Sequence, residues 1–174
     1  MGQSKPITEN RRMDESLFSM WRAVIAMGHA DGVMHDNELA HFRHLFNELD
    51  KGFALTPEQR DRLTADLAAP QDMKELVAKI TDVEQRCLLV GFAQIVAHID
   101  GELHPKEKEV LLFLLSEVPE TPHSLEISEA IRRDIASQMA QRAADMVSEQ
   151  GVRGCALAYA LNALLNRLSM GVRL

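Results

Sequence analysis

The sequence predicts an all-α protein: a helical bundle of two helical hairpins related by a pseudo-twofold axis, with further helices at the C-terminus. Three observations support this prediction. Ala and Leu are abundant and only 5% of the residues are aromatic, a balance that favours helices over β-sheets. Apolar residues recur at spacings of three and four, as on one face of a helix. A short segment also occurs twice along the chain, 69 residues apart.

The first half of the chain contains signals for four helices. The apolar stripe that includes Trp21 predicts a helix at about 14–31, ended by Asp31-Gly32 with Gly32 as a left-handed cap. A second helix is expected to begin near His35 and to end at Gly52. Thr56 followed by Pro, Glu and Gln is a strong helix start, and that helix should end before Pro70. A short helix is expected at about 72–80.

The second half contains signals for four more helices. A capping box from Thr81 to Glu84 opens a helix that should reach Asp100. Pro105 fits the first turn of the next helix, and its wholly apolar run 110–115 predicts deep burial. Two further helices are expected, at about 124–150 and 155–170.

The predicted helices divide the chain into three parts. Residues 1–13 are polar and are expected to form a flexible arm. Residues 14–118 form a domain with an internal repeat, whose copies span about 17–49 and 86–118. Residues 119–174 form C-terminal helices that pack on this domain or extend it.

Composition excludes several classes of protein. The net charge of −7 and the lack of a basic run argue against nucleic-acid binding. No stretch of about 18 apolar residues occurs, so we expect no membrane insertion. We interpret Cys87 and Cys155 as reduced core thiols, which indicates a reducing compartment. Together with the absence of an apolar leader at the N-terminus, this predicts a cytoplasmic protein.

The repeat is clearest around two Asp-Gly turns. Comparison of each residue with the one 69 positions later shows five identities within ten positions, where ordinary residue frequencies give about one at most. The identical pairs are His29 and His98, Asp31 and Asp100, Gly32 and Gly101, His35 and His104, and Glu38 and Glu107. Each copy is therefore expected to be a helix, an acidic turn and a second helix.

The segments 29–38 and 98–107 resemble the TerB-like family, which is named for a tellurite-resistance protein. Related domains occur in membrane-anchored J-domain co-chaperones. The family motif is a small residue, Asp-Gly, an apolar position and Glu, present twice, and the resemblance covers about residues 14–118. It implies an all-α fold, acidic sites suspected of binding metal, and a role in tellurite or other stress responses. It implies no enzymatic reaction.

The two turns have three interpretations. In the first, each Asp at a helix C-terminus caps the next helix, and Glu38 and Glu107 act as first-turn capping acids. In the second, Asp31 with Glu38, and Asp100 with Glu107, supply oxygen ligands to Ca²⁺ or Mg²⁺. In the third, Zn²⁺ binds to the histidines and aspartates of each turn. The histidines of this weaker alternative are His29, His35, His98 and His104.

Two functions remain open from the sequence. One is a non-enzymatic tellurite-resistance or stress-response protein that binds divalent metal at the acidic turns. The other is a protein-interaction module, similar to a co-chaperone adaptor, in which the turns are purely structural caps. No set of nucleophile, base and orienting residue is recognisable. We expect protein partners, among them membrane-associated stress proteins, and a monomer or homodimer.

Overall fold

A computed structural model describes residues 12–30, 32, 34, 36–99, 105–143, 161 and 164. Their helices are α1 (Glu15–Gly28), α2 (Asp36–Gly52), α3 (Pro57–Ala68), α4 (Met73–Lys79), α5 (Val83–Ile99), α6 (Pro105–Ser116) and α7 (Pro122–Ala143). No β-strand forms in these ranges, so the predicted all-α class is confirmed. None of the described helices is long and apolar enough to cross a membrane.

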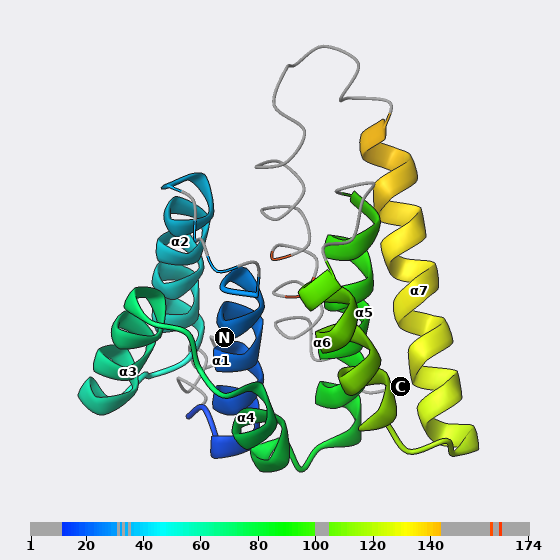
Figure 1. Cartoon of the computed structure of the whole chain (residues 1–174), viewed down its shortest axis with the longest axis horizontal. Coiled ribbons are helices and arrows are strands. Elements are labelled where there is room, and N and C mark those ends of the chain that lie inside the picture. Colours follow the sequence, from blue (N-terminus) through cyan, green and yellow to red (C-terminus); the bar gives the residue numbers. More distant parts are fainter. Residues whose placement is uncertain are drawn as a thin grey trace, which may run out of the picture.

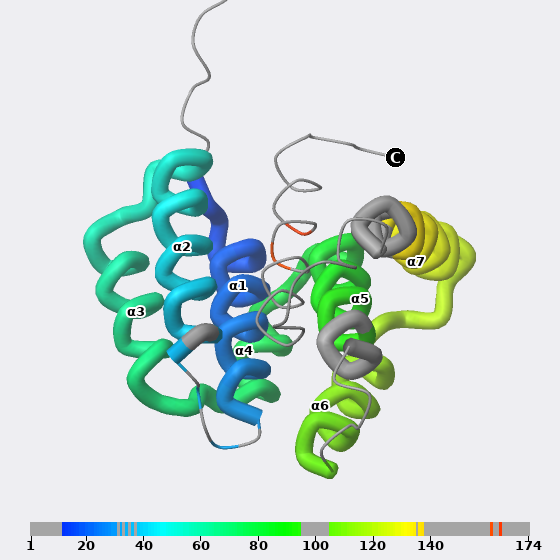
Figure 2. Tube along the Cα trace, turned by 90° about the horizontal axis from the view of Figure 1, so that it is seen from above, coloured from blue at the N-terminus to red at the C-terminus, as the bar shows by residue number. Residues whose placement is uncertain are grey.

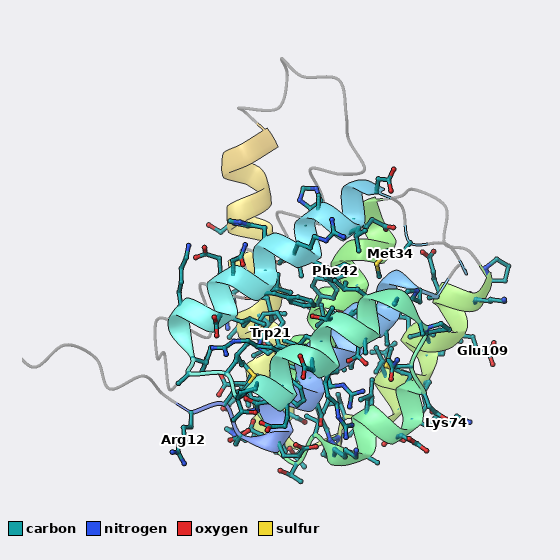
Figure 3. The ribbon with its side chains drawn as sticks, turned by 90° about the vertical axis from the view of Figure 1, so that its left-hand side faces the viewer. Arg12, Trp21, Met34, Phe42, Lys74 and Glu109 are labelled. Carbon is teal, nitrogen blue, oxygen red and sulfur yellow. The ribbon has the colours of Figure 1, made fainter. Side chains whose placement is uncertain are left out.

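The helices α1 and α5 lie side by side in the middle of the bundle (Figure 1). α2 and α3 flank α1 on one side, whereas α6 and α7 flank α5 on the other (Figure 2). α4 packs across the end of α1. Their shared core includes Trp21, Phe42 and Leu89, each at most 1% exposed. Figure 3 shows Trp21 and Phe42 inside the bundle, and Lys74 and Glu109 at its edge.

Local signals explain most helix starts. Thr56 and Gln59 form the predicted capping box of α3, with Pro57 in its first turn. Asp72 caps α4, since its carboxylate accepts hydrogen bonds from the backbone N–H groups of Lys74 and Glu75. These side chains satisfy N–H groups that have no partner within the helix.

The start of α5 differs from the predicted capping box. Asp82, not Thr81, is the capping residue, since its carboxylate accepts a hydrogen bond from Gln85 N at 3.1 Å. The Thr81 N–H is instead bound by a side chain from another helix. Ser16 Oγ accepts from Thr81 N at 3.0 Å and donates to Gln85 Oε1 at 2.6 Å. A tertiary contact has therefore moved the cap by one residue.

The contact between Ser16 and Gln85 joins residues that are 69 positions apart. Equivalent residues meet where a twofold axis passes between two copies. The boundaries of the helices follow the same offset, since α2 begins at Asp36 and α6 at Pro105. Both observations support the predicted pseudo-twofold relation, which stays a prediction.

Two further boundaries differ from the predictions. Met13, assigned to the flexible arm, is 6% exposed and belongs to the core, and its carbonyl accepts a hydrogen bond from Gln59 Nε2. α7 begins at Pro122, two residues before the predicted Ser124, and is capped by Thr121. Ile127 and Ile131 on α7 are buried, so this helix contributes to the same core.

The prediction of deep burial for residues 110–115 is wrong. Only Leu114 in this run is buried, whereas Leu112 and Leu115 are 58% and 41% exposed. An apolar run has no helical periodicity, so it cannot indicate which side of the helix is covered. α6 packs on α5 and presents its other side to solvent.

The cysteine prediction is tested at one position. Cys87 is a free, buried thiol, as predicted, and burial raises its pKa. Cys155 and the predicted helix at 155–170 lie outside the described residues, apart from Leu161 and Leu164. These two residues are helical and buried.

Candidate functional site

The first Asp-Gly turn begins three residues earlier than the sequence predicts. α1 ends at Gly28, and the backbone N–H of its capping residue His29 bonds to Ala26 O. Gly32 has φ of +89° and donates its N–H to His29 O at 2.9 Å. Gly32 therefore has the predicted left-handed conformation, but within the turn and not as the helix cap.

This earlier helix end alters the electrostatic argument for the turn. The predicted cost of a carboxylate at the C-terminus of α1 assumed that Asp31 belongs to the last helical turn. Helix-dipole effects fall off within that turn, and α1 ends three positions before residue 31. For the first copy, the position at which α1 ends therefore no longer supports the predicted penalty.

The candidate metal ligands are only partly described. Glu38 lies in the first turn of α2, and Glu107 lies in the first turn of α6, as predicted. The described residues do not include four of the candidates, Asp31, Asp100, His35 and His104. The side chain of His98 also lies outside the described part of the chain. Within the described part of the chain, no three His, Cys, Asp or Glu side chains are grouped closely enough to hold a metal.

His29 contacts α3 through its ring. His29 Nε2 lies 2.9 Å from the carbonyl oxygen of Asp66. Because a carbonyl can only accept, Nε2 is the protonated nitrogen and donates. In the neutral ring, this hydrogen bond places the remaining lone pair on Nδ1. It also ties the residue that precedes the acidic turn to the third helix.

Asp66 also forms the buried ion pair of the first copy. Arg22 Nε donates to Asp66 Oδ2 at 2.6 Å, and Arg22 Nη2 donates to Oδ1 at 3.0 Å. The two side chains are 7% and 3% exposed. Arg22 Nη2 also donates to Gln71 Oε1 at 3.1 Å, and the guanidinium lies 5.9 Å from the Phe18 ring centroid. The hydrogen bonds to Asp66 raise the pKa of Arg22.

This cluster holds α1, α3 and the start of the turn together. A bidentate contact between guanidinium and carboxylate fixes both side chains in one geometry. Asp66 accepts from α1 with its carboxylate and from His29 with its carbonyl. The cluster thus positions the first acidic turn relative to the bundle.

Sequence reasoning missed Arg22 and Asp66. One signal was available: Arg22 stands within the largely apolar stretch 17–28 and is followed directly by Ala23 and Val24. A charge on a buried helix requires a counter-ion. The identity of that counter-ion, 44 residues later, is a tertiary fact that no local pattern supplies.

Comparison with known proteins gives one match. A family model described as tellurite resistance protein TerB matches residues 18–119. This range begins within α1, ends just after α6 and includes both Asp-Gly turns. No curated protein and no solved structure matches the chain.

Proposed function

Because this chain belongs to the family of the tellurite resistance protein TerB, we propose that it acts in tellurite resistance or a related stress response as a non-enzymatic binding protein. The observation that carries this proposal is the extent of the family match. It spans both helix-turn-helix copies, including the positions of the two acidic turns.

The ligand proposed for the turns is a divalent cation, with Asp31, Glu38, Asp100 and Glu107 as the protein ligands. Carboxylate oxygens are the donors that Ca²⁺ and Mg²⁺ prefer. The position of each glutamate in the first turn of the following helix supports this set. Zn²⁺ is the weaker alternative, since each turn offers only two histidines and one aspartate, whereas a zinc site usually has four ligands.

Thermal unfolding of the full chain with added Ca²⁺, Mg²⁺ or Zn²⁺ tests this proposal. A cation at a hundredfold excess over its Kd stabilises by about 2.7 kcal/mol, which raises Tm by roughly 5–10 °C for a chain of this size. The double variant Asp31→Asn/Asp100→Asn should lose this rise. Asp61→Asn/Glu126→Gln removes two exposed charges elsewhere and should keep it. If the Asn variant responds to all three ions like wild type, the turns bind no metal.

The second candidate is a protein-interaction adaptor in which both turns are structural caps. First-turn glutamates at Glu38 and Glu107 are also what capping requires, and two exposed leucines on α6 favour a binding surface. The same Asn double variant separates the candidates. An adaptor should recover the same proteins from the membrane-associated fraction with or without the two aspartates. Loss of all partners from the folded variant would contradict purely structural turns.

A further inference from the structure

A hollow of about 390 Å³ opens to solvent between α2 and α3, which lie side by side (Figure 2). Its apolar floor consists of Leu55 and Leu63, which are 5% and 1% exposed, and of the half-buried Phe46. The rest of its lining is polar and includes two arginines. These polar residues are Arg43, Asn47, Asp50, Arg60 and Thr64. A hollow of this size that combines apolar side chains with a few polar groups is typical of a small-molecule site.

The basic charge of this lining is only partly neutralised. Arg60 donates through Nε and Nη2 to Asp50 Oδ1 at 2.9 and 2.7 Å, and Asp50 is the one acidic residue among the described residues that line the hollow. Within the described part of the chain, Arg43 forms no hydrogen bond or ion pair, and Nη1 of Arg60 has no hydrogen-bond partner. The lining is therefore basic, although the whole chain has a net charge of −7.

The helical hairpin itself does not require these two arginines. At the offset of 69 residues, Arg43 corresponds to Leu112 and Arg60 to Glu129. The second copy forms its own pair of helices, α5 and α6, without a guanidinium at either position. The fold of the repeat therefore does not explain why the hollow of the first copy is basic.

We infer that this hollow binds a small organic acid whose carboxylate is joined to an apolar group. The carboxylate pairs with the guanidinium of Arg43 and with Nη1 of Arg60, since guanidinium N–H groups match a carboxylate in charge and geometry. The apolar group covers Phe46 and the leucines of the floor.

The extent of the hollow favours a small molecule over an extended peptide. On α2 its lining runs from Arg43 to Asp50, a distance of about 11 Å along the helix. Leu55, on the segment that joins α2 to α3, lines one end. A site this short, with the connecting segment at its end, accommodates a small acid without requiring a longer chain to continue through it.

The test uses the ¹⁵N-labelled full chain and the probe 3-phenylpropionate at constant ionic strength. Saturable shift changes should be centred on the amides of residues 43–50 and 55–64 and on the side-chain Nε–H signals of Arg43 and Arg60. The expected Kd is about 1–5 mM, because a ligand of few atoms gains limited free energy. This site shares no residue with either acidic turn, so the result does not depend on cation binding or on an adaptor role.

An uncharged isostere of the probe separates charge from apolar contact. The amide 3-phenylpropionamide has the same shape and no negative charge, so it should bind at least about fivefold more weakly, the factor that an exposed ion pair contributes at most. Arg43→Gln should weaken binding of the acid by about threefold to fivefold for the same reason. The control Arg62→Gln removes the same charge from an exposed position of α3 outside the hollow, and it should leave the Kd unchanged.

A third variant tests the hollow by its volume. Asn47 is exposed and lines the hollow, so Asn47→Trp should fill it and abolish saturable binding of both compounds. All three substituted residues are exposed, and each variant should therefore keep the wild-type amide spectrum away from the substitution.

Four results would overturn the inference. The first is the absence of saturable shifts with wild type up to about 50 mM probe. The second is an equal Kd for the acid and the amide. The third is an equal loss of affinity in Arg43→Gln and Arg62→Gln, which would show a general effect of charge. The fourth is a blocked Phe-Glu dipeptide that binds at least about tenfold more tightly than the acid, which would assign the hollow to a protein partner.

Discussion

The ion pair between Arg22 and Asp66 should respond very differently to the loss of one partner and of both. Each side chain is less than a tenth exposed, and the pair is bidentate. Removing one partner leaves an uncompensated buried charge, which costs about 3–5 kcal/mol. For a chain of this size we expect Tm to fall by roughly 6–20 °C in Arg22→Met or in Asp66→Leu.

Replacing both partners should restore most of the stability. Apolar residues of similar volume in place of a buried ion pair are often neutral or stabilising. The double variant Arg22→Met/Asp66→Leu should therefore unfold within about 1 kcal/mol of wild type. Gln71, which also accepts from Arg22, is half-buried and can turn to water.

Urea unfolding measures these differences in the free energy of unfolding. It is followed by far-UV circular dichroism and by the fluorescence of Trp21, the single tryptophan of the chain. The exposed pair of Arg60 and Asp50 is a matched control, with similar distances but side chains 51% and 42% exposed. Arg60→Met should cost less than about 1 kcal/mol. The reasoning would be refuted if a single variant of Arg22 or Asp66 lost no more stability than this. It would also be refuted if the double variant lost as much stability as the two single variants together.

Two further predictions concern the contacts of α1 with its neighbours. A Cβ on Gly28 would lie 2.8 Å from Phe42 Cε2, so Gly28→Ala should lower the free energy of unfolding by about 1–3 kcal/mol through overpacking. In thermal unfolding, adding Phe42→Leu should recover part of this loss. Strictly additive effects of the two substitutions would show that the two residues do not compete for space. Ser16→Ala removes the acceptor for the N–H of Thr81 and should lower the free energy of unfolding by about 1–2 kcal/mol. The exposed hydroxyl of Ser116 bonds within its own helix, so the control Ser116→Ala should be nearly neutral. Equal effects of the two substitutions would contradict the role of Ser16.

Local signals predicted the helices well because capping and periodicity act over a few residues. Thr56 and Gln59 predicted the start of α3, and the structure contains both of their hydrogen bonds. The cap of α5 was placed one residue too early because Ser16, from a distant part of the chain, binds the Thr81 N–H. The end of α1 was placed three residues too late because the left-handed Gly32 belongs to the turn.

Burial of α6 and the contacts of His29 were beyond local reasoning. The run 110–115 is apolar on every side, so only the packing of its neighbours determines that Leu112 is exposed. The sequence offered His29 as a weaker candidate metal ligand in a repeated motif, and gave no indication of its contact with α3. Its ring donates to Asp66 O, a backbone atom on a helix that the repeat does not include. Both outcomes depend on where α3 and α7 pack.

The buried ion pair marks where the two hairpins differ. Arg22 on α1 corresponds to Gly91 on α5, which has no side chain that could pair with a carboxylate. Burying the carboxylate of Asp66 is costly unless a counter-ion is present, and Arg22 supplies that counter-ion from α1. The packing of α3 against α1 therefore depends on a residue that the repeat does not preserve, and for this reason the repeat alone could not predict it.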